Sequence, residues 1–261
     1  MKTKLSLFFL SLFVSCTNNE MNILNDYWNC DQMLNTTGLK LYQFTPFTDK
    51  EWREMSYDYK LERRQIPEGF LTAMTTKELF YQFVNTDLSK SIVVANTIQQ
   101  GFEREANRMN MLSELLNRPD AGLTLLELLQ KTDPSTINGP DCFWWFECLQ
   151  IIAAQPDVIN NMIDKDIDNY VLQQMRCHDA ILRLSKSEDI WDYPQSVGII
   201  LFGIGNVMLK YEYEPFIQLI KENEYCRNLM MSAMLIDEQT TILIINCIHN
   251  FQKNYDELKK M

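Results

Sequence analysis

Apolar residues recur at helical spacing along this chain from about residue 49 onward, and helix-start signals interrupt them repeatedly. Thr48 with Glu51, and Thr75 with Glu78, form capping-box patterns, in which side chains satisfy backbone N–H groups of the first helical turn. Between these signals the apolar residues lie three or four positions apart, which is the period of one helix face. No segment shows the clean alternation of a half-buried strand. The pattern therefore predicts an all-α fold.

The composition agrees with this prediction. Eight glycines and eight prolines are few for a chain of 261 residues, and all-β proteins with many turns usually need more. The hydrophobic content of 46% is sufficient for a substantial core. Helix pairs of roughly 30–40 residues suggest a multi-helix array or a bundle of antiparallel helix pairs. A solenoid-like stack is an alternative, although no residue signature repeats with that period to support it.

Several elements can be placed from local signals. The capping box at Thr48 predicts a helix that runs to about Arg64, and a later helical pattern breaks near Gly101. Residues 133–140 form the clearest loop, and they divide the domain into candidate layers at 49–132 and 141–261. Residues 196–209 are the most apolar stretch and predict a central buried helix. The last helix is expected over residues 237–251, with Ile242, Ile245 and Ile248 facing inward.

The N-terminus carries the clearest targeting signal. Lys2 and Lys4 precede an apolar run from Leu5 to Val14, followed by Ser15 and Cys16. A basic start and a short apolar core are typical of a secretory segment. A membrane-spanning helix needs about 20 apolar residues, which this run does not supply. The alternative is a short buried helix in a cytosolic protein.

The segment Val14-Ser15-Cys16, followed by a polar run, resembles the lipobox of a bacterial lipoprotein. This resemblance implies cleavage before Cys16, acylation of that cysteine, export, and residence in the cell envelope with a membrane as partner. It divides the chain into a signal peptide (1–15), a tether (16–48) and a helical domain (49–261).

Charge excludes one class of partner. Removal of residues 1–15 takes away Lys2 and Lys4 and no acid, which leaves 22 basic and 35 acidic residues and a net charge of −13. Nucleic-acid binding requires clustered basic residues, so no nucleic-acid partner is expected. Anionic headgroups would repel the chain as a whole, so acyl chains would have to provide the anchoring.

Six further cysteines leave the disulfide state open. An exported chain can form disulfides, but pairing cannot be deduced from spacing alone. Cys142 and Cys148 would face different sides of one helix, which argues against a bridge between them. Buried free thiols are the alternative for all six. These cysteines are Cys30, Cys142, Cys148, Cys177, Cys226 and Cys247.

The sequence contains no complete catalytic or metal-binding motif. Residues 164–168 alternate acids like a calcium loop, but Asn169 and Met175 stand where glycine and glutamate are needed. Gly203-Ile204-Gly205 lacks a third glycine, and close helix packing explains it better than nucleotide binding. Cys177 and His178 are neighbours that would point about 100° apart on a helix. No catalytic residue, cofactor or metal site is therefore assigned.

Residues 143–146 are the densest aromatic cluster, Phe-Trp-Trp-Phe. Aromatic side chains can stack on sugar rings, so Trp144, Trp145 and the nearby Glu147 are the candidate binding residues. Four consecutive helical residues point in all directions, so at least two must be buried, and core packing is the alternative. A glycan site would gain support if Asp141 and His178 converged with them on one cavity.

Four short motifs lie between residues 65 and 131: Gln65–Glu68, Met74–Thr76, Gln100–Phe102 and Glu114–Ala121. With these motifs, this stretch resembles a set of uncharacterised exported helical proteins of gut anaerobes. The resemblance implies a helical fold and export, and no activity. We therefore expect a lipid-anchored, non-enzymatic binding or scaffold domain with a protein or glycan partner. The alternative is a glycan-binding or glycan-processing protein that uses carboxylates and aromatic rings.

Overall fold

A computed structural model describes residues 28–137, 139–184, 193–234 and 237–258. These residues are mostly helical and contain no β-strand, which confirms the all-α prediction. One isolated bridge joins Trp28 to Thr132. The expected signal peptide, Cys16 and the first part of the expected tether lie outside the described residues.

The helices follow one another closely along the chain. The first half comprises α1 (Cys30–Leu34), α2 (Asp49–Glu54), α3 (Tyr57–Arg63), α4 (Glu68–Leu71), α5 (Thr76–Val84), the 3-10 helix η1 (Ser89–Val94), α6 (Ile98–Arg108), α7 (Asn110–Asn117), α8 (Ala121–Gln130) and the 3-10 helix η2 (Pro134–Thr136). The second half comprises α9 (Pro140–Ala153), α10 (Pro156–Asn160), α11 (Asp164–Leu184), α12 (Tyr193–Lys210), α13 (Glu214–Glu222), α14 (Glu224–Ser232) and α15 (Glu238–Leu258).

Both predicted capping boxes are present. Thr48 caps α2 with Glu51, and Thr75 caps α5 with Glu78, each with both reciprocal hydrogen bonds. The helix expected to run from Thr48 to Arg64 is instead two helices. Met55 is extended after α2, and the Ser56 side chain accepts a hydrogen bond from the Tyr59 N–H to begin α3. A second N-cap inside the apolar pattern therefore splits the element.

Gly101 lies inside α6 and does not end a helix, contrary to the sequence prediction. A Cβ atom at this position would lie 1.9 Å from the carbonyl oxygen of Ile92 in η1. The glycine permits α6 and η1 to approach with backbone against backbone, and this tertiary contact outweighs the usual cost of glycine in a helix.

The predicted central helix is α12, and every residue from Ser196 to Met208 is buried. It packs against α9, α10, α11 and the last three helices. A Cβ at Gly203 would lie 2.3 Å from the Tyr170 hydroxyl, and one at Gly205 would lie 2.6 Å from the Met230 sulfur. Both glycines therefore serve close helix packing, as the sequence suggested.

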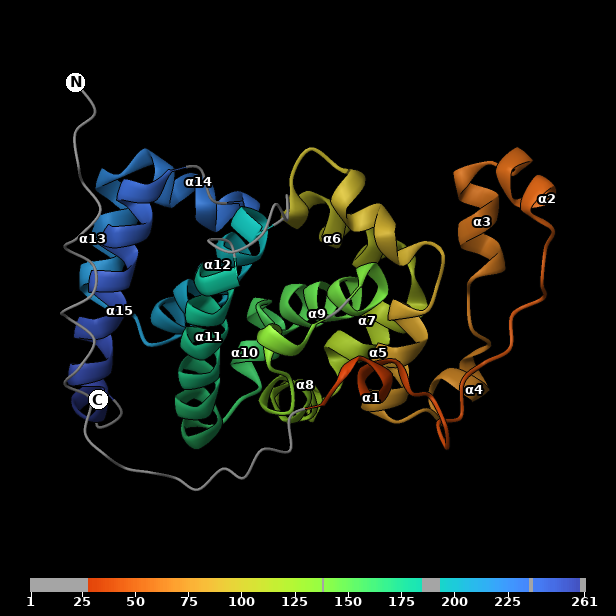
Figure 1. The fold of residues 1–261 in the computed structure, drawn as a ribbon, viewed down its shortest axis with the longest axis horizontal. Coiled ribbons are helices and arrows are strands. Elements are labelled where there is room, and N and C mark those ends of the chain that lie inside the picture. Colours follow the sequence, from red (N-terminus) through yellow and green to blue (C-terminus); the bar gives the residue numbers. More distant parts are fainter. Residues whose placement is uncertain (1–27, 138, 185–192, 235–236, 259–261) are drawn as a thin grey trace.

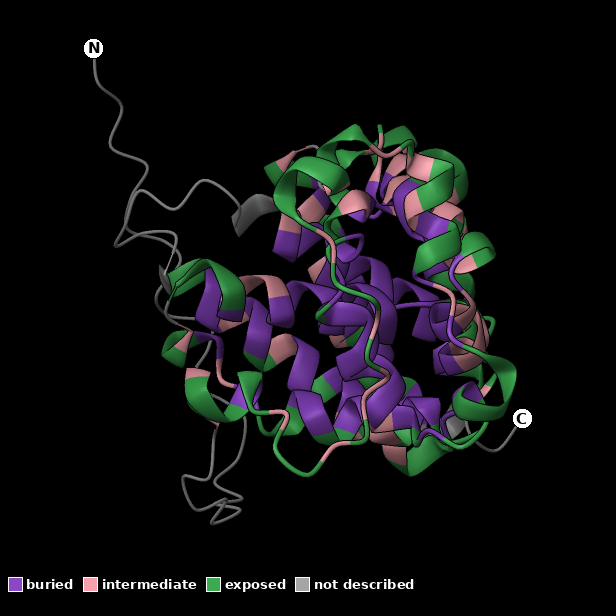
Figure 2. Ribbon diagram, turned by 90° about the vertical axis from the view of Figure 1, so that its right-hand side faces the viewer, coloured by how far each residue is buried: buried purple, intermediate pink, exposed green. Residues whose placement is uncertain are grey.

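The core is continuous across the expected boundary between the two layers. Figure 1 shows an elongated molecule with α2 and α3 at one end and α13 and α15 at the other. Figure 2, which views the molecule from the side of Figure 1 that carries α2 and α3, shows buried residues in the interior and exposed residues around them. One cluster of buried side chains extends from Met33 to Tyr255. Contacts such as α14 on α6 and α11 on α8 link helices far apart in sequence, so the solenoid alternative is not supported.

The last helix differs in register from the prediction. Ile248 is buried, but Ile242 is 40% exposed and Ile245 is half-buried. The inward stripe of α15 instead follows Ile244, Ile248 and Phe251, at helical spacings of four and three. Among the described residues, no helix has the combined length and apolar character that crossing a membrane requires.

Candidate functional site

Helix α9 carries the three predicted binding residues and presents them to different neighbours. Gly139, with φ 87°, and Pro140 at the first helical position begin the helix. Trp144 is half-buried, and its indole N–H donates to the Ser89 hydroxyl at 3.0 Å. Trp145 is 1% exposed and packs edge-on against Phe80 with ring centroids 5.3 Å apart. Trp145 is therefore a core residue.

Glu147 points toward α12. It is 5% exposed, and its carboxylate accepts a hydrogen bond of 2.8 Å from the Ser196 hydroxyl. Residues two positions apart on a helix lie about 200° apart around its axis, so Glu147 and Trp145 face opposite sides of α9. The three candidate residues thus contact three different neighbours, Ser89, Phe80 and Ser196. Trp144, Trp145 and Glu147 do not share one binding surface.

Asp141 and His178 do not join them. Asp141 lies exposed in the first turn of α9, with a carboxylate oxygen 4.0 Å from the Lys90 ammonium. His178 is buried in α11, and its Nδ1 lies 3.1 Å from the Asp179 carboxylate. The preceding Cys177 is fully buried, and burial raises its pKa to about 12. A thiol with that pKa remains protonated at neutral pH and is a poor nucleophile.

Uncharged polar groups gather between α9 and α11. The side chains of Gln150 and Gln174 and the hydroxyl of Tyr170 are fully buried, and no hydrogen-bond partner approaches these polar atoms among the described residues. Burial raises the pKa of Tyr170, so its hydroxyl stays protonated. The group holds no charge at neutral pH and offers neither a base nor a nucleophile.

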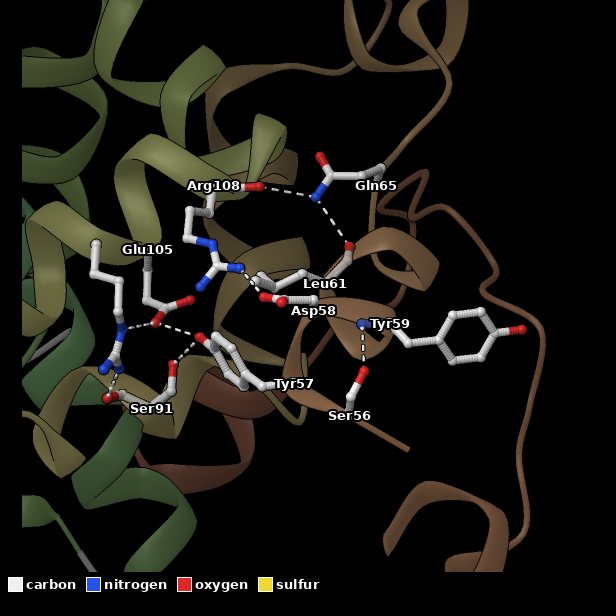
Figure 3. A network of polar contacts seen from close by, with 10 residues as sticks. Ser56, Tyr57, Asp58, Tyr59, Leu61, Gln65, Ser91, Glu105 and Arg108 are labelled. Atoms are coloured by element: carbon white, nitrogen blue, oxygen red, sulfur yellow. Dashed lines mark hydrogen bonds and ion pairs between the residues drawn. The ribbon is translucent and has the colours of Figure 1, made fainter. Parts of the chain in front are cut away.

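A second polar network joins α3 to α6, and sequence reasoning did not find it (Figure 3). Glu105 is fully buried, and its Oε1 accepts hydrogen bonds from the Tyr57 hydroxyl at 2.5 Å and from Arg104 Nε at 2.8 Å. Arg104 also donates to the Ser91 carbonyl at 2.7 Å. Burial and the bond to Glu105 raise the pKa of Tyr57.

Further contacts of this network fasten α3 at both ends. Arg108 pairs with Asp58, and the Gln65 amide donates to the carbonyls of Leu61 and Arg108, both at 2.9 Å. Tyr57 and Glu105 lie 48 residues apart, so no local pattern signals the contact. The network secures α3 to α6. Figure 3 shows Tyr57, Glu105 and Arg108 lying between these two helices.

The N-terminal segment is attached to the domain more firmly than the tether prediction implied. Cys30 and Cys142 form a disulfide with Cα atoms 5.7 Å apart, a normal separation for such a bond. Met33 is fully buried, and the backbone N–H groups of Lys40 and Tyr42 donate to Glu78 and Gln82, each at 2.7 Å. The described domain thus begins by residue 28, because these contacts fix residues 28–48 on it.

Arg64 fixes the next part of the same segment. Its guanidinium lies 5.0 Å from the ring centroid of Phe44 and 4.5 Å from that of Trp52, and it makes a bidentate pair with Asp87. Arginine stacks on rings and binds carboxylates through its planar fork, so one side chain holds residues 44–52 against α3 and the start of η1.

The remaining four cysteines, Cys148, Cys177, Cys226 and Cys247, are buried free thiols. Within the described residues, no group of three or more histidine, cysteine, aspartate or glutamate side chains could hold a metal ion. Asp164, in the acidic segment that resembles a calcium loop, accepts a 2.6 Å hydrogen bond from the Tyr211 hydroxyl.

Comparisons with known proteins add no assignment: no family model, no curated protein and no solved structure matches this chain.

Proposed function

We propose that this chain is an exported, lipid-anchored protein of the bacterial cell envelope, and that its helical domain is a non-enzymatic binding or scaffold module. The anchor is Cys16, the acylated residue of the lipobox-like segment. The observation that best supports export is the Cys30–Cys142 disulfide, whose first cysteine lies fourteen residues after Cys16 along the chain. Disulfides persist in oxidising compartments outside the cytosol.

The burial of reactive groups supports the non-enzymatic part of the proposal. Glu147 and Cys177 are enclosed in the core, and His178 is 2% exposed. General acids, bases and nucleophiles must reach a substrate, so these three would need rearrangement of the core to act. The glycan alternative has weaker support, because Trp145 and Glu147 are buried and face opposite sides of α9.

Acylation and export can be tested together. Cells that express the natural full chain are labelled with a radioactive fatty acid, and membranes are separated by flotation. The labelled protein should float, and mass spectrometry should find a mature N-terminus at Cys16. The Cys16→Ala variant should lose the label. An unlabelled chain that keeps Met1 and stays in the soluble fraction would contradict the proposal.

The disulfide provides an independent readout of the compartment. Alkylation of the denatured, unreduced protein should modify four cysteines of the domain and leave Cys30 and Cys142 unmodified until a reductant is added. Free thiols at both positions in protein taken directly from cells would argue for a reducing compartment and against export.

A further inference from the structure

Two lysine side chains lie over the ring of Trp28, where the described chain begins. The ammonium of Lys77 lies 5.3 Å from the centroid of the indole, and that of Lys131 lies 5.1 Å from it. The Trp28 N–H donates to the Lys131 carbonyl at 2.6 Å, and the Thr136 hydroxyl donates to the Trp28 carbonyl at 3.3 Å. The disulfide at Cys30 fixes the chain two residues later.

Neither of these two lysines forms an ion pair with a carboxylate of the described residues. Lys50, Lys90 and Lys221 each lie within 4.0 Å of a carboxylate, whereas neither Lys77 nor Lys131 has such a partner within the described ranges. The neighbouring Glu78 is buried, and its carboxylate accepts hydrogen bonds from Thr75 and from the Lys40 N–H.

Three acids lie within three residues of Trp28 or Lys131 in sequence: Asp26, which is outside the described residues, Asp31 and Asp133. Asp31 is exposed in α1, and the Asp133 carboxylate accepts from the Ser135 N–H to begin η2. Neither approaches Lys77 or Lys131 as an ion pair among the described contacts. Among the described residues, both ammonium groups therefore lie beside one half-buried indole and pair with no carboxylate, in a chain whose net charge after removal of residues 1–15 would be −13.

The face formed by Trp28, Lys77 and Lys131 lies close to Cys16 along the chain. Twelve residue steps separate Trp28 from Cys16, so a fully extended chain could reach about 40 Å at most. If Cys16 is acylated, this limit keeps Trp28 close to the bilayer and gives the face a high effective concentration at the lipid surface. Tryptophan and lysine are also residues that favour the headgroup region, where an apolar body and a polar end are both accommodated.

We propose that Trp28, Lys77 and Lys131 form the membrane-contacting face of the anchored domain, and that the two ammonium groups bind the phosphates of anionic phospholipid headgroups. This inference rests on the proposed lipid anchor. A lysine bound over an indole keeps donors free on its far side, and ammonium groups bind phosphate as point charges. The contact orients the acidic domain, with the rest of its negative surface directed away from the lipid.

Lysine footprinting tests the contact directly. The acylated full chain is reconstituted in vesicles of phosphatidylcholine, alone or mixed with phosphatidylglycerol, and an amine-acetylating reagent labels exposed lysines. Lys77 and Lys131 should be acetylated about fivefold more slowly on the anionic vesicles, the factor expected for a lysine near such a surface. High salt should remove the difference, because it screens charges beyond a few ångströms.

Lys50 and Lys221 are matched controls, since their side chains are 83% and 61% exposed and lie on α2 and α13. Their rates should be equal on the two kinds of vesicle. Equal rates for Lys77 and Lys131, or equal slowing of all four lysines, would overturn the inference.

Substitutions separate the surface from the anchor. With brominated phosphatidylglycerol as quencher, the tryptophan fluorescence of the protein should be quenched in the natural chain and in K50Q/K221Q. This quenching should be lost in K77Q/K131Q and in Trp28→Phe. Flotation and the mass of Cys16 are measured on the same samples. A chain that floats with acylated Cys16 but shows no Trp28 quenching contradicts this inference alone, whereas an unacylated chain that does not float overturns both proposals.

Discussion

At the scale of single residues, the space around each glycine decides which can be replaced. A methyl group at Gly101 would collide with the Ile92 carbonyl, whereas nothing lies within 4 Å of a Cβ at Gly69 in α4. We expect Gly101→Ala to destabilise the protein by about 1–3 kcal/mol, the usual cost of overpacking. Gly69→Ala should be neutral or stabilising by up to about 1 kcal/mol. Urea unfolding of both variants checks this, and equal midpoints would contradict the α6–η1 contact.

The buried thiols predict how stability responds to alkaline pH. Burial raises the pKa of Cys177 from 9.0 to about 12, and those of Cys226 and Cys247 to about 11. The folded state therefore holds these protons more tightly than the unfolded state, and the resulting stability is complete below pH 9. It should be lost as pH rises from 9 through the folded values of about 11 to 12.

Urea unfolding at pH values from 9 upward should show the free energy of unfolding falling as pH rises. The fall should be less steep in Cys177→Ala, because this variant lacks one titrating group. The same pH dependence in the variant and the natural protein would show that the Cys177 thiol is not protected in the fold.

At the scale of elements, the disulfide joins α1 to α9 across 112 residues of chain. Cross-links that close long loops reduce the entropy of the unfolded chain, and loss of a native one typically costs about 2–4 kcal/mol. The double variant Cys30→Ser/Cys142→Ser should therefore unfold at lower urea concentration. A reductant should lower the midpoint of the natural protein to that of the variant and leave the variant unchanged. A natural protein insensitive to reductant would contradict the pairing.

The α3–α6 network predicts an unequal effect of two glutamates on one helix. Glu105→Ala removes the buried carboxylate that Tyr57 and Arg104 share, although each keeps a hydrogen bond to Ser91. We expect a loss of about 2–3 kcal/mol in the free energy of unfolding, limited because Arg104 is partly exposed and can be solvated. Glu103 is exposed and bonded to Gln99, so Glu103→Ala should change stability by less than about 0.5 kcal/mol. Hydrogen exchange should also become faster in α3 for Glu105→Ala alone. Equal effects of the two substitutions would contradict the network.

At the scale of the whole molecule, the sequence predicted what depends on neighbouring residues and missed what depends on distant ones. The caps at Thr48 and Thr75 and the buried helix α12 follow from local patterns. The position of Gly101 inside α6 depends on η1, which packs against it only in the tertiary structure. The Cys30–Cys142 disulfide and the Tyr57–Glu105 hydrogen bond likewise depend on the complete fold. Sequence spacing alone does not select these partners from the other cysteines or acids of the chain.

The continuous core makes a final prediction about cooperativity. Loop 133–140 suggested two layers, yet α8 packs on α9 and α11, and α14 packs on α6. If the layers were separated, each would expose apolar surface that the other now covers. Neither layer should therefore be stable alone. Calorimetry of the natural protein should show one transition, and a fragment of residues 139–258 should lack a cooperative transition. A fragment that unfolds cooperatively, or two resolved transitions in the intact chain, would mean that the layers fold as separate domains joined by the disulfide.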